Sequence, residues 1–130
     1  MASNAEWLSA LAKKLNNPHF GLLPDYANYR KSDTDAEFIY QSVRQNMPWA
    51  KGVSVKGAWD VDGNHLYFDL AKCLEISLES GYKGFWGIES GIRSADRSAL
   101  DKLSPDEKKK LDWQAVNWTK AVIDKTVFEK

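Results

Sequence analysis

The sequence predicts an α/β protein whose strands run parallel, and three observations support this. Segments with apolar residues at helical spacing alternate with short apolar runs along the 130 residues. Capping boxes stand before three of the expected helices. The expected strands finish near Asp25, Lys56 and Glu89, about 30 residues apart, which leaves room for the crossovers that parallel strands require. An open sheet and a slice of a barrel fit this pattern equally well.

The first helix is expected to begin at the capping box of residues 3–6, where Ser and Glu satisfy each other's backbone donors. Residues 16–18, Asn-Asn-Pro, end it, because proline disfavours helical geometry in the residue before it. Residues 20–23 follow as a short apolar run that ends at Pro24 and Asp25, and they predict a buried strand. The apolar face of this first helix comprises Trp7, Leu8, Leu11 and Leu15.

The second helix is expected to begin at the capping box of residues 34–37 and to end before Pro48. Residues 51–58 then predict the second strand. The apolar residues of this helix are Phe38, Ile39, Val43 and Met47.

A turn is predicted at residues 60–64, because Asp-Gly-Asn tolerates positive φ. The third helix is expected over residues 69–80, with Gly81 in the left-handed conformation that closes many helices. Residues 84–88 predict the third strand. The apolar face of this helix comprises Leu70, Leu74 and Leu78.

A polar loop is expected over residues 90–102, followed by a helix start at residues 104–107. There a capping box is combined with proline at the first helical position. One side of this last helix is apolar and is expected to pack on the rest of the protein, with Leu111, Ala115, Trp118 and Val122 along it.

The composition argues against nucleic acid and membrane partners. Eighteen basic residues balance eighteen acidic ones, so no excess charge favours phosphate backbones or anionic lipid. No apolar run is long enough to span a bilayer, and residues 1–20 carry no targeting signal. Cys73 is the one cysteine, which excludes an intramolecular disulfide and favours a reducing, cytoplasmic location. Its expected role is that of a small buried apolar residue.

Polar side chains stand at all three expected strand ends, where parallel α/β proteins place their functional groups. Two of them, Asp25 and Glu89, are carboxylates, which a hard divalent cation prefers as ligands. Asp25 also fits a simple turn former, and Glu89 a partner of Arg93. An inward-facing Lys56 fits a structural ion pair as well as a site role. The two histidines, His19 and His65, are expected to be structural.

Three segments carry a resemblance to a known family. Residues 20–29 (FGLLPDYANY), 47–56 (MPWAKGVSVK) and 81–89 (GYKGFWGIE) resemble the sixth, seventh and eighth strands of xylose isomerase-like barrels, in the subgroup of sugar-phosphate isomerases and epimerases. The resemblance implies that residues 1–130 form one partial domain. This would be the C-terminal half of a TIM-type barrel, with three strands and four helices.

The resemblance also implies an enzyme that transfers a proton next to a sugar carbonyl with the help of manganese or magnesium. Asp25 and Glu89 would be metal ligands, and Glu89 and Lys56 catalytic residues. Ser54 stands where many relatives carry a histidine ligand, so Lys56 is expected to supply positive charge for an oxyanion. The residues expected to bind the sugar or sugar phosphate are Asn28, Ser54 and Trp59.

In the related barrels another glutamate precedes the segment that matches residues 3–8, so the sequence predicts a protein fragment that supplies half an active site. An open sheet face and open strand edges usually find a partner. Self-association or pairing with an N-terminal half is therefore expected. The alternative function is a non-catalytic half-barrel that acts in assembly.

Overall fold

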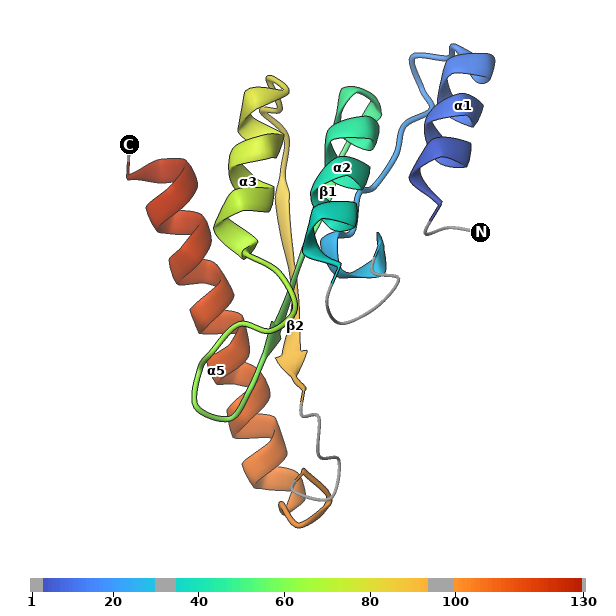
Figure 1. Ribbon diagram of the computed structural model, residues 1–130. Coiled ribbons are helices and arrows are strands. Elements are labelled where there is room, and N and C mark those ends of the chain that lie inside the picture. The colour runs from blue at the N-terminus through green and yellow to red at the C-terminus, as the bar shows by residue number, and fades with distance from the viewer. Residues whose placement is uncertain (1–3, 30–34, 94–99, 130) are drawn as a thin grey trace.

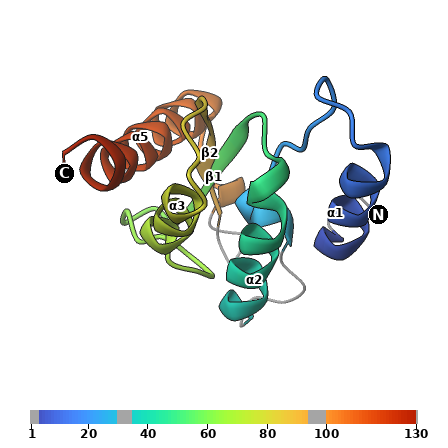
Figure 2. The ribbon, with the colours of Figure 1, turned by 90° about the horizontal axis from the view of Figure 1, so that it is seen from above.

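The computed structural model describes residues 4–29, 35–93 and 100–129 and has a mixed α/β fold. Its helices are α1 (Ala5–Leu15), α2 (Ala36–Asn46), α3 (Leu70–Glu79) and α5 (Pro105–Ile123), and its strands are β1 (Val53–Trp59) and β2 (Trp86–Ile92). The two strands form a parallel sheet, joined by the crossover through α3 (Figure 1). Viewed from above, α5, α3 and α2 curve around one side of the strands, and α1 lies farther out beside α2 (Figure 2).

Side-chain caps fix the helix starts. Asn4, rather than Ser3, caps α1 by accepting a 2.8 Å hydrogen bond from the Trp7 N–H, and Asp35 caps α2. Ser3 and Thr34, the expected caps, lie outside the described residues. The capping box at Ser104 is confirmed, with hydrogen bonds in both directions between it and Glu107. The third helix also matches the prediction, since Asp69 caps it and Gly81 follows at φ +81°.

The predicted apolar face of α1 is only partly buried, since Leu8 and Leu11 are half-buried. Trp7 and Leu15 are exposed, and the buried residues of this helix are Ala5 and Ala12. The helix packs on α2, where the buried Asn46 side chain donates a 2.8 Å hydrogen bond to the Ala5 carbonyl. Small residues allow this close approach, so Trp7 and Leu15 are left facing outward.

The prediction of three strands was wrong by one for the described residues, because residues 20–25 make only isolated bridges to the neighbouring chain. Leu22 bridges to Ala50, and Asp25 bridges to Ser54, both in the parallel direction. Leu22 and Asp25 are three positions apart, whereas their partners Ala50 and Ser54 are four apart, so the register shifts by one residue between the two bridges. Pro24 has no N–H to donate there, although its carbonyl accepts a 2.9 Å bond from Ser54. Residues 20–25 therefore lie beside β1, and β1 lies beside β2. Among the described residues these segments form a partial sheet that does not close into a barrel.

The strand β2 begins and ends later than residues 84–88. It spans Trp86–Ile92, so Glu89 and Ser90 lie within the strand and not in the loop after it. Each residue of β2 is paired with one of β1, and the pair that matters most for the site is Lys56 with Glu89.

A buried hydroxyl joins both strands to α5. Thr119 Oγ1 accepts a 2.8 Å hydrogen bond from Trp59 Nε1 and lies 2.6 Å from Ser90 Oγ. Gly57 leaves the space that this group needs, because a Cβ there would clash with Thr119, with the Trp59 indole and with Ser90. Val53 and Val55 continue the same buried face of β1, which packs on the helices.

The turn after β1 is built as the sequence predicts. The Asp60 carboxylate accepts hydrogen bonds from the backbone N–H groups of Asp62 and Asn64 at 2.9 and 2.8 Å, and Gly63 adopts φ +85°. His65 then returns to β1, where its Nε2 accepts a 3.2 Å bond from the Ala58 N–H.

Two predictions about single buried residues, His65 and Cys73, agree with the structure. The ring of His65 packs edge-on against Trp59 and Phe68, with centroids 4.9 and 4.8 Å away, as expected of a structural histidine. Cys73 is fully buried in α3. Across the described ranges, none of the helices combines the length and the apolar character that a membrane crossing needs.

Candidate functional site

Strand alternation separates a packed face of β1 from a polar one. Val53 and Val55 are buried against the helices, and Ser54 and Lys56 point to the opposite side. Glu89 shares this side, because it is the register partner of Lys56 in a parallel pair. Figure 2 shows that α2, α3 and α5 lie on one side of the two strands. Lys56 and Glu89 meet on the other face.

Lys56 is the centre of this cluster. Its Nζ lies 2.7 Å from Glu89 Oε1, 3.3 Å from Asp25 Oδ2 and 3.4 Å from Asn28 Oδ1. The Ser54 hydroxyl lies between the two carboxylates, 3.4 Å from Asp25 Oδ2 and 3.3 Å from Glu89 Oε2. Five predicted site residues thus form one cluster linked through Lys56 and Ser54: Asp25, Asn28, Ser54, Lys56 and Glu89.

The segment that carries Asp25 is held from both sides. Asp25 bridges to Ser54 in β1, and the short 3-10 helix η1 (Tyr26–Tyr29) follows it and carries Asn28. Tyr26 is fully buried, and its hydroxyl makes a 2.8 Å hydrogen bond with Ser77 of α3. The buried tyrosine fixes the start of η1 and so positions the Asp25 carboxylate toward Lys56.

The two carboxylates have opposite pKa shifts. Burial raises the pKa of Asp25 above 3.8, and the neighbouring Lys56 offsets only part of this rise. Asp25 Oδ1 is buried and has no hydrogen-bond partner. Glu89 is more exposed, at 59% of its side chain, and its hydrogen bond with Lys56 lowers its pKa below 4.5. For Lys56 itself, burial lowers the pKa, but Glu89 and Asp25 together outweigh burial and leave it raised above 10.5.

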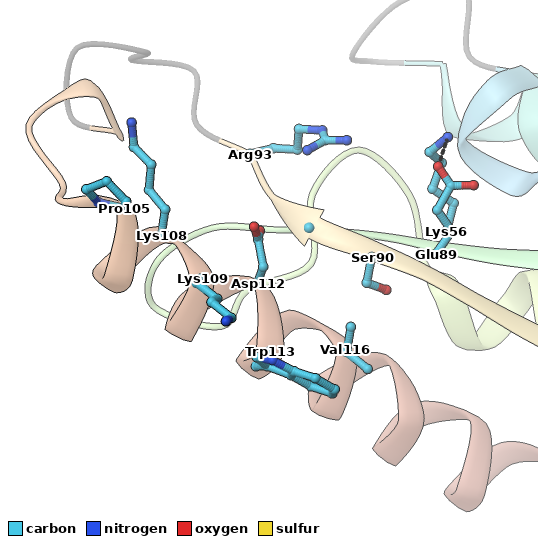
Figure 3. Close-up of a pocket in the computed structure, with 11 residues that line it drawn as sticks. Lys56, Glu89, Ser90, Arg93, Pro105, Lys108, Lys109, Asp112, Trp113 and Val116 are labelled. Atoms are coloured by element: carbon cyan, nitrogen blue, oxygen red, sulfur yellow. Dashed lines mark ion pairs between the residues drawn. The ribbon is translucent and has the colours of Figure 1, made fainter.

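A groove of about 670 Å³ extends from this cluster along the edge of β2 to α5. Figure 3 shows Lys56 and Glu89 on one side of the strand and Ser90 on the other, with Arg93 on the side of Glu89. The sequence predicts no site role for the residues that α5 adds to this groove. The only sign of these residues in the sequence is the run of lysines in the first half of the helix, which also fits a solvated surface. The groove residues from α5 include Lys108, Lys109, Asp112 and Trp113.

Trp59 and the expected partner of Glu89 differ from the sequence prediction. Trp59 lies apart from the cluster, because alternation turns its ring to the packed face, where it is buried and bonded to Thr119. The structure does not place it where a sugar would bind beside Lys56. The alternative that Glu89 pairs with Arg93 is replaced by the pair with Lys56, and Arg93 donates a 3.1 Å hydrogen bond to the Ile92 carbonyl.

Chemically, the cluster combines an exposed ionised carboxylate with a cation and a hydroxyl. Such a set can accept a proton at Glu89 and stabilise negative charge on an oxygen near Lys56. Within residues 4–29, 35–93 and 100–129, no three His, Cys, Asp or Glu side chains gather as they do around a metal ion.

The sequence matches no protein-family model and no curated protein.

Proposed function

We propose that this chain supplies half of the active site of a sugar or sugar-phosphate isomerase or epimerase, as the C-terminal half of a xylose isomerase-like barrel. One observation carries the proposal. Asp25, Lys56 and Glu89 come from three successive segments that run in parallel, and their side chains meet on the open face. The resemblance described for the sequence adds the reaction class and the kind of substrate.

Glu89 is the proposed acid and base. It is ionised at neutral pH and accessible, so it can remove a proton from the carbon next to a substrate carbonyl. The electron pair of that C–H bond moves to the carbonyl, whose oxygen becomes an enediolate oxyanion. Lys56 stabilises this oxyanion with its positive charge. The oxyanion takes the place of the Asn28 amide oxygen, which lies 3.4 Å from Lys56 Nζ. For isomerisation, the hydroxyl proton on the deprotonated carbon passes to the oxyanion and Glu89 returns its proton to the former carbonyl carbon, so the carbonyl moves by one position. For epimerisation, a group outside this half of the site delivers a proton to the deprotonated carbon from the face opposite Glu89.

The implied manganese or magnesium fits the residues poorly. Lys56 Nζ lies between the two carboxylates that would hold the metal, and Ser54 stands in place of a histidine ligand. The proposed proton transfer therefore depends on Glu89 and Lys56, with Ser54 and Asn28 as polar contacts for the sugar.

Deuterium exchange tests the proposal, because exchange needs only one base and is therefore expected of this chain itself. The full chain is incubated in D₂O with a panel of aldoses, ketoses and their phosphates, and proton NMR follows the signal of the carbon-bound proton next to the carbonyl. We expect exchange with at least one sugar. Glu89→Gln abolishes it, and Lys56→Met slows it by about 100-fold or more.

The control for this experiment is Glu75→Gln, which removes an exposed carboxylate from α3 and should leave exchange unchanged. Absence of exchange across the whole panel, or exchange that persists in Glu89→Gln, would sink the proposed chemistry.

A second candidate function, a half-barrel that acts in assembly, is supported by the large apolar side chains on the surface. Phe85, just before β2, is 89% exposed, and Trp113 of α5 is 62% exposed. Phe85 lines a groove with Trp86 and Ile88 of β2, and Trp113 lines the groove beside Glu89 and Gly91; in the described residues β2 is paired only with β1. A partner that covers both grooves would bury these rings.

A further inference from the structure

The Lys56 ammonium is surrounded by oxygen atoms from two segments of the chain, residues 25–28 and β2. An ammonium group has three N–H donors, and three acceptors lie around this one: Asp25 Oδ2, Asn28 Oδ1 and Glu89 Oε1, at 3.3, 3.4 and 2.7 Å. Only 19% of the Lys56 side chain is exposed. The group is thus enclosed by ligand-type oxygens much as a bound cation would be.

A divalent metal between the same carboxylates would have to share this space with Lys56. Magnesium takes oxygen ligands at about 2.0–2.1 Å. The ammonium nitrogen lies between the Asp25 and Glu89 oxygens that would have to approach the metal this closely. The second oxygen of Asp25, Oδ1, is buried and offers no exposed ligand. A metal placed beside the ammonium would also meet its positive charge at short range, where burial weakens the screening by water.

We propose that the Lys56 ammonium is the resident cation of this site and takes the place of a divalent metal. The protein then binds no divalent metal at Asp25 and Glu89 while Lys56 is present. Two carboxylates, one ammonium and no further cation give the cluster a single net negative charge. Lys56 would fill this position whether or not the site acts on a sugar.

Manganese titration of the full chain tests this assignment. The variant Lys56→Met removes the ammonium and keeps most of the volume of the side chain, which frees the space between the carboxylates. By isothermal calorimetry and by the electron paramagnetic resonance signal of free Mn²⁺, we expect no saturable site in the wild type up to 1 mM, roughly the weak end of protein sites for hard divalent cations. We expect at least 10-fold tighter binding in Lys56→Met, lost again in Lys56→Met/Asp25→Asn.

A second measurement on the wild type keeps the test decisive if Lys56→Met does not fold. Mn²⁺ broadens nearby amide signals, so the signals of Ser54 and Glu89 should broaden no more than those beside the exposed carboxylate of Asp60. Saturable Mn²⁺ binding by the wild type that disappears in Asp25→Asn would overturn the assignment. So would selective broadening at Ser54 and Glu89, or a folded Lys56→Met variant with no gain in Mn²⁺ binding.

Discussion

Lys56 forms ion pairs with two carboxylates that differ in their exposure to water. Asp25 is largely buried, so its ionised form loses hydration that one ammonium does not fully replace, whereas Glu89 keeps most of its hydration and gains a short ion pair. Their effects on stability therefore have opposite signs. Asp25 favours folding at low pH and loses this contribution as the pH rises from 3.8 through its raised pKa. The contribution of Glu89 is present above pH 4.5 and is lost as the pH falls through its lowered pKa.

Carbon-13 NMR of the side-chain carboxyl groups checks these shifts. We expect the Asp25 midpoint above 3.8 and the Glu89 midpoint below 4.5. In Lys56→Met both midpoints should rise, because Lys56 lowers the pKa of each carboxyl group. Lys72→Met is the matched control, since Lys72 pairs with Glu37 away from the cluster and should leave both midpoints in place. A Glu89 midpoint that does not move in Lys56→Met would contradict this account of the site.

At the scale of elements, the contact between the sheet and α5 depends on a glycine. A Cβ at Gly57 would lie inside van der Waals contact of Thr119 Oγ1 and Trp59 Nε1, and 2.9 Å from Ser90 Oγ. All three atoms belong to buried or partly buried hydrogen bonds, so none can move without losing a bond.

Gly57→Ala is therefore expected to lower the free energy of unfolding by about 3 kcal/mol or more, through overpacking. Gly81→Ala is the control, because that position has open space within 4 Å and only its φ of +81° resists a side chain. It should cost about 1 to 2 kcal/mol. Urea denaturation followed by circular dichroism compares the two, and equal losses would contradict the importance of this contact.

The sequence predicts the local features of these elements well and the tertiary features less well. Caps at Asp69 and Ser104 and the turn at Asp60 depend on residues within a few positions, so their signals are complete in the sequence. The register shift beside Pro24 depends on which chain lies next to it, and no local pattern contains that information. The sequence of α1 likewise does not show which of its faces is buried, because that depends on how closely α2 approaches it.

For the site, the sequence predicts the members better than their arrangement. Ser54 and Lys56 share a face by alternation, and Asp25 and Glu89 follow from the resemblance. The central position of Lys56 requires the pairing of β1 with β2, which only the folded chain supplies. Trp59 falls on the other face because it is three positions from Lys56, an odd number in a strand.

At the scale of the whole molecule, large apolar side chains are exposed to solvent, which is typical of a surface that a partner covers. Phe85 and Trp113 are large and exposed, and they line grooves at the start of β2 and beside its later residues, where a second chain could pair or pack. Burial of each ring would contribute about 1.5–3 kcal/mol to association.

We therefore expect light scattering to show an oligomer at micromolar concentration. The double variant Phe85→Ser/Trp113→Ser should weaken association by about 100-fold or more, since two buried rings are lost. Glu75→Ser, an exposed change on α3, serves as the control and should leave the mass unchanged. A wild-type chain that stays monomeric across the micromolar range would argue against assembly.

The hydrogen bond between Ala58 and His65 determines which tautomer the ring adopts. Because the Ala58 N–H points at Nε2, the single imidazole proton must sit on Nδ1, from which it is donated to the Phe68 carbonyl 2.8 Å away. A second proton on the ring would place two donors face to face at Ala58. Burial already lowers the pKa of His65, although the Phe68 carbonyl and Asp69 oppose this shift. The C-terminal end of β1, two residues beyond Lys56, is thus built around an uncharged imidazole in one tautomer, and acid below pH 6.5 removes part of what holds it.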